Sequence, residues 1–133
     1  MSTLIPGIYN RDRNDSTIRI YHNIKFPLDD ILDVFHPLFG STYPFDEMIC
    51  TIYTVHHIFC AYDVQQARCI ACALVNNVRN NSGLYIMLFG VQKSNQGHGI
   101  GTQLLAAIIQ WARQTGYTFI YLQRYGLFTG SNN

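Results

Sequence analysis

Residues 84–101 join an apolar run to three closely spaced glycines, which limits the chain to folds in which a strand turns sharply into a helix. The segment reads LYIMLFGVQKSNQGHGIG and continues directly into TQLL. Its first half, to Gln92, has the composition of a strand, and apolar positions recur at helical spacing after Gly99. The glycines let the backbone approach a bulky anion, and the first-turn N–H groups lack intrahelical partners. The segment therefore predicts an anion site suited to a diphosphate.

Two common phosphate-binding loops do not fit this segment. The glycines are spaced GxGxG, whereas the dinucleotide fingerprint needs GxGxxG and an acidic residue about twenty positions later. The GK[ST] ending of a nucleotide-hydrolase loop is also absent from the sequence. The segment therefore matches neither of these loops, and a glycine-rich turn without a ligand stays an alternative.

The composition indicates one globular domain. The 133 residues are 48% hydrophobic and 13% charged, with a net charge of +1 and scattered basic residues, so we expect no nucleic-acid partner. No apolar run reaches the roughly 20 residues of a membrane helix, and residues 1–10 do not resemble a signal peptide. We therefore expect no membrane partner and a cytoplasmic location, with the nucleus as an alternative. In that reducing setting the four cysteines would be free thiols: Cys50, Cys60, Cys69 and Cys72.

Cys69 and Cys72 have the spacing of metal ligands, and His56 and His57 lie nearby in the sequence. In a strand, however, residues three apart point to opposite faces, so the pair is not expected to chelate one ion. We predict buried apolar cysteines and no bound metal.

The remaining segments complete a mixed sheet with helices, in the order β-α-(α)-β-β-β-α-β, an α/β (α+β) class. We expect a polar lead-in over residues 1–16 and a single domain over residues 17–133. The predicted elements are a strand at Thr17–Tyr21, a helix opened by Pro27 and ended by Pro37 and Gly40, an aromatic loop or short helical segment at 38–48, β-rich runs at Ile49–Val64 and Arg68–Val78, a strand at Leu84–Gln92, a helix from Gly99 to Gly116, and a strand at Tyr117–Gln123.

The run Gln96-Gly97-His98-Gly99-Ile100-Gly101 resembles the Q/R-x-x-G-x-G/A signature of the GNAT superfamily of N-acetyltransferases. The resemblance covers residues 17–123 and is most specific over residues 84–122. It implies a GNAT fold, acetyl-CoA as co-substrate without a metal, and direct acetyl transfer to an amine. The residues that it assigns to the cofactor are Phe89, Gly90, Val91, Gln96, Gly97, His98, Gly99, Ile100, Gly101 and Thr102. It also implies a β-bulge near Gly90 that separates this strand from its neighbour.

Within the superfamily, the runs YIMLFGV, HGIGTQLL and IYL resemble the protein N-terminal acetyltransferases, especially the eukaryotic Met-start type. Residues 38–44 are similar to the first substrate loop of that group. The resemblance implies a protein or peptide N-terminus as acceptor, bound by Phe39, Tyr43 and Met87.

In that group a tyrosine and a histidine order the water that relays the amine proton. The tyrosine is present as Tyr85, but the histidine position falls on Gln123, which cannot accept a proton at neutral pH. We assign Tyr85 and Gln123 to catalysis, with Gln123 limited to positioning the water.

After the last predicted strand, the sequence lacks the turn, helix and hairpin with which the family usually continues. Three alternatives follow: a shortened enzyme, a homodimer that completes its acceptor cleft with a neighbour, or a catalytically silent module that binds acyl-CoA or a partner. A small-amine or lysine acetyltransferase of the same fold is a further alternative.

Overall fold

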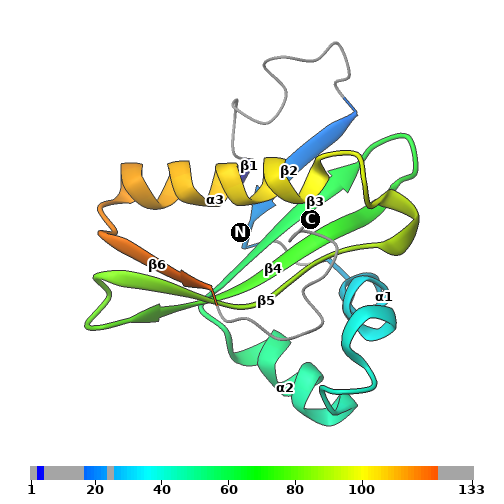
Figure 1. Ribbon diagram of the computed structural model, residues 1–133, viewed down its shortest axis with the longest axis horizontal. Helices are drawn as coiled ribbons and strands as arrows, with labels where there is room; N and C mark the ends of the chain where they lie inside the picture. Colours follow the sequence, from blue (N-terminus) through cyan, green and yellow to red (C-terminus); the bar gives the residue numbers. More distant parts are fainter. Residues whose placement is uncertain (1–2, 5–16, 24–25, 123–133) are drawn as a thin grey trace.

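A computed structural model describes residues 3–4, 17–23 and 26–122 of the protein (Figure 1). The elements are β1 (Thr3–Leu4), β2 (Ile18–His22), α1 (Leu28–Phe39), α2 (Phe45–Thr54), β3 (His57–Asp63), β4 (Arg68–Val78), β5 (Gly83–Val91), a 3-10 turn (Lys93–Asn95), α3 (Ile100–Thr115) and β6 (Phe119–Leu122). The strands form one sheet in sequence order, antiparallel from β1 to β5, with β6 parallel to β5. The predicted mixed, mostly antiparallel sheet is confirmed.

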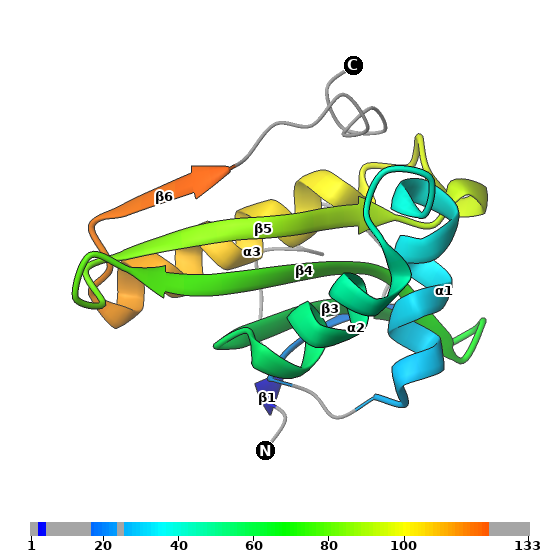
Figure 2. The ribbon, with the colours of Figure 1, turned by 90° about the horizontal axis from the view of Figure 1, so that it is seen from below.

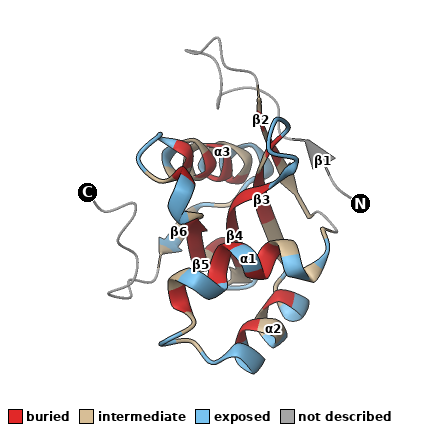
Figure 3. Cartoon of the chain, turned by 90° about the vertical axis from the view of Figure 1, so that its right-hand side faces the viewer, coloured by how far each residue is buried: buried red, intermediate tan, exposed pale blue. Residues whose placement is uncertain are grey.

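Helix α3 covers one face of the sheet, and α1 and α2 cover the other (Figures 1 and 2). Each face has its own hydrophobic core. The α3 core includes Phe59, Ile86 and Leu104, and the α1/α2 core includes Phe35, Met48 and Leu88. Seen from the side, the helices are buried along their sheet-facing sides and exposed on their outer sides (Figure 3), as expected of amphipathic helices.

Two β-bulges change which residues face which core. In β4, Ala71 pairs with Ala61 while Cys69 pairs with Tyr62, so Ile70 is one extra residue. In β5, Leu88 pairs with Leu74 while Ile86 pairs with Val75, so Met87 is the extra residue. Each insertion shifts the two-residue alternation by one.

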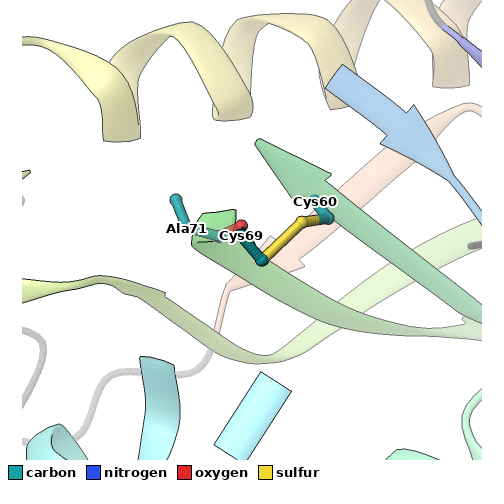
Figure 4. Close-up of a disulfide and its surroundings, with 3 residues drawn as sticks. All are labelled: Cys60, Cys69 and Ala71. Carbon is teal, nitrogen blue, oxygen red and sulfur yellow. Dashed lines mark hydrogen bonds between the residues drawn. A yellow bond between two sulfur atoms is a disulfide. The ribbon is translucent and has the colours of Figure 1, made fainter. Parts of the chain in front are cut away.

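The bulge at Ile70 corrects the prediction for the cysteines. It turns Cys69 and Cys72 to the same face of β4, where both lie in the α1/α2 core with Cys60 of β3. Cys60 and Cys69 are joined by a disulfide (Figure 4), so the prediction of free thiols is wrong for this pair. Their Cα atoms are 6.4 Å apart on neighbouring strands, within the usual range for a bridge.

The other two cysteines are free thiols, Cys72 buried and Cys50 exposed. Burial raises the pKa of the Cys72 thiol, which keeps it protonated and unreactive beside the disulfide. Within the described part of the chain, no group of three or more His, Cys, Asp or Glu residues could hold a metal ion. No helix in the same ranges is long and apolar enough to cross a bilayer.

The first helix ends at Gly40, as predicted, although Pro37 alone does not end it. Pro37 lies inside α1, which runs to Phe39 before Gly40 caps it. Because Pro37 is near the C-terminal end, its missing N–H removes one helical hydrogen bond without ending the helix.

The expected strand at residues 49–54 is wrong, since these residues belong to α2. Pro44 occupies the N-cap, and Asp46 and Glu47 lie in the first turn, where the helix dipole favours negative charge. Met48 and Ile52, four residues apart, are the buried pair that fixes the helix on the core. The isoleucine and tyrosine content favoured a strand, but these start signals and the spacing of the buried side chains specify a helix.

A hydrogen-bonded array lies on the α3 face and ties β2 to the connection between α3 and β6. His57 Nε2 lies 2.9 Å from Asn77 Oδ1, which also accepts a 2.8 Å hydrogen bond from the Tyr117 hydroxyl. Because that oxygen only accepts, His57 donates through Nε2, and its Nδ1 accepts from His22 Nε2 at 2.8 Å. The His22 ring also stacks on Phe59 and contacts Trp111.

This array makes stability depend on pH. Burial, and then the charge of His57, lower the pKa of His22 from 6.5 to about 4. The unfolded chain therefore binds the proton more tightly, and the contribution of the array is complete above pH 6.5 and is lost as the pH falls toward 4. After allowance for solvent screening, we expect a loss of roughly 1–2 kcal/mol, seen as a melting temperature lower by several degrees.

The comparison that isolates this effect is His22→Gln, which keeps a donor for His57 but does not titrate. We expect its melting temperature to vary less between pH 4 and 6.5 than that of the wild type. His36→Gln removes an exposed histidine of α1, on the other face of the sheet, and serves as the control. An equally steep pH dependence in His22→Gln and the wild type would contradict the assignment.

Candidate functional site

The glycine-rich connection has the predicted strand–loop–helix geometry. β5 ends at Val91, the 3-10 turn follows, and α3 begins at Ile100. Gly97 (φ +85°) and Gly99 (φ +78°) adopt left-handed backbone conformations that glycine reaches without strain. Gly99 is the N-cap residue and provides no side-chain hydrogen bond, so the first-turn N–H groups of α3 have neither intrahelical partners nor a side-chain cap from this residue.

The loop is fastened to the sheet by side-chain amides. Asn95 is buried and accepts a 3.0 Å hydrogen bond from Gln66 Nε2, which also donates to Asp63. Gln96 Nε2 donates to the carbonyl oxygen of Val91 at 3.0 Å. These bonds hold the loop between β5 and the β3–β4 turn, so the start of α3 is fixed before any ligand arrives. The sequence pattern indicated Gln96 but not Asn95, whose role depends on a partner 29 residues away.

Two cations lie beside this loop. Lys93 is exposed in the 3-10 turn, and Arg68 Nη2 lies 3.5 Å from Ser94 Oγ. Both cations belong to or contact the 3-10 turn, so positive charge lies in the same connection that leads to the N-terminus of α3. His98 and Thr102, both assigned to the cofactor, are exposed within the same segment. Ile100 points into the α3 core, so only its backbone could contribute.

β5 is pressed closely from both faces at its C-terminal end. A Cβ at Gly90 would lie 2.7 Å from Leu38 Cδ1 of α1, and one at Gly101 would lie 3.3 Å from Val91 Cγ2. Phe89 and Val91 face the α3 core, whereas Gly90 faces α1. The three residues assigned to the pantetheine arm are therefore held in a fixed position.

The bulge predicted near Gly90 is at Met87 instead. Gly90 pairs with Cys72 in regular register, and the extra residue lies three positions earlier. Because the bulge follows Tyr85 and Ile86, it leaves Tyr85 and Met87 on the α1/α2 face and returns Phe89 to the α3 face. Met87 Sδ accepts a hydrogen bond from Asn76 Nδ2 at 2.9 Å, and Asn76 pairs with Tyr85 across the strands.

The predicted acceptor residues of the α1–α2 segment are more buried than a binding loop would require. Phe39 is 3% exposed and belongs to the α1/α2 core. Tyr43 is half-buried, and its hydroxyl lies 2.8 Å from Thr51 Oγ1 of α2. The acceptor roles of Phe39, Tyr43 and Met87 stay predictions, and Gln123 lies outside the described residues.

Sequence reasoning missed the neighbours that β6 brings to Tyr85. In the parallel β5–β6 pair, Tyr85 is opposite Tyr121, and Gly83 is opposite Phe119. The Tyr121 hydroxyl accepts a 3.2 Å hydrogen bond from Arg79 Nη2, 42 residues earlier in the chain. The pairing of β5 with β6 depends on the long crossover through α3, so no local signal in the sequence indicates these neighbours.

Comparison with known proteins identifies what this architecture is similar to. The family model described as acetyltransferase (GNAT) family matches residues 28–128. No protein of curated function matches the sequence significantly. Among solved structures, the chain is similar to N-acetylglutamate synthase from Neisseria gonorrhoeae complexed with coenzyme A and N-acetyl-glutamate, with a TM-score of 0.64 and 18% identity over 83% of this chain and 26% of that one.

Two further solved structures share the architecture. A GNAT family acetyltransferase from Elizabethkingia anophelis with acetyl-CoA bound has a TM-score of 0.58 and 22% identity, over 80% of this chain and 65% of that one. An aminoglycoside acetyltransferase from an uncultured soil metagenomic sample, in complex with sisomicin, has a TM-score of 0.62 and 17% identity, over 85% and 81%. At these identities the structures show a shared fold only. The chain spans about a quarter and about two-thirds of the first two of these chains.

The close approach of α1 to β5 can be tested at Gly90. We expect Gly90→Ala to lower the free energy of unfolding by about 1–3 kcal/mol, because the new Cβ overlaps Leu38 in a packed core. Leu38→Ala removes the nearest atoms, so the double variant should lose less stability than the sum of the single variants. Urea denaturation of the four proteins measures the coupling, and simple additivity would contradict the described packing.

Proposed function

The chain belongs to the acetyltransferase (GNAT) family, and from that premise we propose that it transfers an acetyl group from acetyl-CoA directly to an amine, preferably the α-amine of a peptide or protein N-terminus. The predicted GNAT fold is confirmed by the family match and by the solved structures. The narrower resemblance to Met-start N-terminal acetyltransferases rests on the sequence runs alone. None of the three structures described above carries that activity in its name.

The observation that carries the proposal is the rigid junction of β5 and α3. First-turn N–H groups that lack intrahelical partners, two left-handed glycines and two cations in or beside the loop would offer a site for a diphosphate. A Cβ placed at Gly97 would meet no atom within 4 Å, so there is open space on that side of the loop. Residues 96–102 would hold the diphosphate, and the backbone of Phe89, Gly90 and Val91 would bind the pantetheine arm as an added strand does.

The chemical step needs few groups from the protein. The neutral amine attacks the thioester carbonyl carbon and a C–N bond forms. The nitrogen then gives up its extra proton to water, the C–S bond breaks, and the thiolate takes a proton from solvent. A backbone N–H of β5 near the bulge would stabilise the oxyanion. The amine must first lose a proton, and Tyr85, on the α1/α2 face beside the bulge, would position the water that accepts it. Gln123 would hold the same water as donor or acceptor without being the base.

Binding of acetyl-CoA is the first test. A ligand that binds only the folded protein stabilises it by about 2.7 kcal/mol at a hundredfold excess over its Kd, so the melting temperature should rise by several degrees. Gly97→Ala should raise the Kd for acetyl-CoA about tenfold, because a methyl group fills the open side of the loop. Gly116→Ala is the matched control: it also has positive φ and open space, but lies at the opposite end of α3. No rise at millimolar acetyl-CoA would rule out the acyl-CoA site.

Turnover is the second test. We expect acetylation of peptide N-termini, measured by mass spectrometry, with kcat in Tyr85→Phe reduced tenfold or more because the hydroxyl no longer orders the water. Tyr53→Phe, an exposed tyrosine on α2, is the control. Binding of acetyl-CoA without transfer to peptide, lysine or small amine would favour the silent acyl-CoA-binding module. Transfer restricted to lysine or small amines would favour the alternative enzymes.

A further inference from the structure

Three aromatic side chains and one methionine form a strip on the α1/α2 face, where β5 pairs with β6. We call Tyr85, Met87, Phe119 and Tyr121 the aromatic strip. Their common face follows from the pairing, since Ile120 and Leu122 of β6 pack on the α3 core and the alternate residues Phe119 and Tyr121 therefore point the opposite way. The Phe119 and Tyr121 rings contact each other with centroids 5.1 Å apart, and the Phe119 ring lies over Gly83.

The aromatic strip lies at the end of the sheet that the described helices leave uncovered. α1 packs at the other end of β5, against Gly90. Seen from below, α1 and α2 lie over one half of the sheet, whereas the β4–β5 hairpin and β6 extend beyond them (Figure 2). Tyr121 is 46% exposed, and Tyr85 and Met87 are partly exposed. Tyr121 has the largest exposed fraction of the four and is the part of the strip most open to a ligand.

The charges around the aromatic strip disfavour one class of acceptor. Arg79 donates to the Tyr121 hydroxyl, and its backbone is held at φ +55° in a turn where Ser82 N and Oγ both bond the Arg79 carbonyl oxygen. The described carboxylates lie elsewhere, on α1, on α2 and at the end of β3: Asp29, Asp30, Asp33, Asp46, Glu47 and Asp63. A polycationic acceptor would meet the Arg79 guanidinium beside Tyr121, and β5 and β6 carry no carboxylate.

From these observations we infer that the aromatic strip binds the acceptor, and that the acceptor is an amine with an aromatic or large apolar group next to the reacting nitrogen and no second positive charge. This inference rests on the proposed function. The Tyr85 and Tyr121 rings offer stacking surfaces for a ring, and Met87, held by Asn76, provides a polarisable contact beside the bulge. A peptide N-terminus would then be selected by its first side chain, with a large apolar residue favoured over alanine.

The test compares two acceptors that differ only in this group, phenylalanine amide and alanine amide, with spermidine as the polycationic probe. We expect kcat/KM to be higher for phenylalanine amide by roughly two- to tenfold, the effect of one stacked aromatic contact. Tyr121→Ala should bring that ratio close to one, and Tyr121→Phe should keep it. Tyr53→Ala, at a tyrosine 71% exposed on α2, should also keep it.

The outcomes separate the inference from the function on which it rests. Acetylation of both amides at equal kcat/KM, or an unchanged ratio in Tyr121→Ala, would overturn the aromatic strip as acceptor site while leaving the acetyltransferase intact. Spermidine as the best acceptor would overturn the charge argument in the same way. No acetylation of any amine, with or without a rise in melting temperature with acetyl-CoA, would instead contradict the proposed function. Arg79→Gln should improve the use of spermidine relative to phenylalanine amide, and its failure to do so would also count against the inference.

Discussion

The close contact of β5 with a helix on each face is the constraint on which the site depends. Gly90 lets α1 approach from one side, and Gly101 lets α3 approach from the other, onto Phe89 and Val91. A side chain at Gly90 would overlap Leu38 of α1, and one at Gly101 would press on Val91 of β5. Because packed interiors transmit the resulting shifts rather than absorb them, Gly101 fixes the distance between the backbone of β5 and the first turn of α3, and Gly90 fixes the approach of α1. A ligand that contacts both the β5 backbone and the first turn of α3 must fit that distance.

The bulge at Met87 divides β5 into two parts whose α1/α2-facing surfaces differ. On the α1/α2 side of β5, Tyr85 and Met87 are large and partly exposed, whereas the next two residues on that side, Leu88 and Gly90, are buried under helix α1. Along the same strand, the surface changes from one that can contact a ligand to one that supports a helix. Met87 and Val91 are about 13 Å apart at the rise of a strand. The proposed acceptor site and the proposed cofactor site therefore lie on one strand, which holds them at a fixed separation.

The parts of the fold that follow from short-range signals were predictable. The α3 helix, its glycine-rich start and its cap at Gly116 all depend on residues within a few positions of one another. The α2 helix was mispredicted because its composition favours a strand, although Pro44 and the acidic first turn were visible in the sequence. Composition could not locate the bulges, since an inserted residue leaves no compositional trace. The family resemblance implied one in β5 but placed it three residues too late. The disulfide follows from one of them, because only the extra residue at Ile70 turns Cys69 toward Cys60.

The candidate site also has one part that short-range sequence signals predict and one part that long-range contacts assemble. The cofactor segment is contiguous, so its pattern could be read directly, whereas Tyr121 and Arg79 reach Tyr85 only through the parallel pairing of β6 and the hairpin after β4. The charges are divided as well: Arg68 and Lys93 flank the loop, and five of the described carboxylates lie on α1 and α2. A bound diphosphate would meet cations at one end of β5, while the other end offers aromatic rings and one guanidinium. Since the family fold is shared by acetyltransferases of very different substrates, it is this second end, assembled from long-range contacts, that would determine which amine is used.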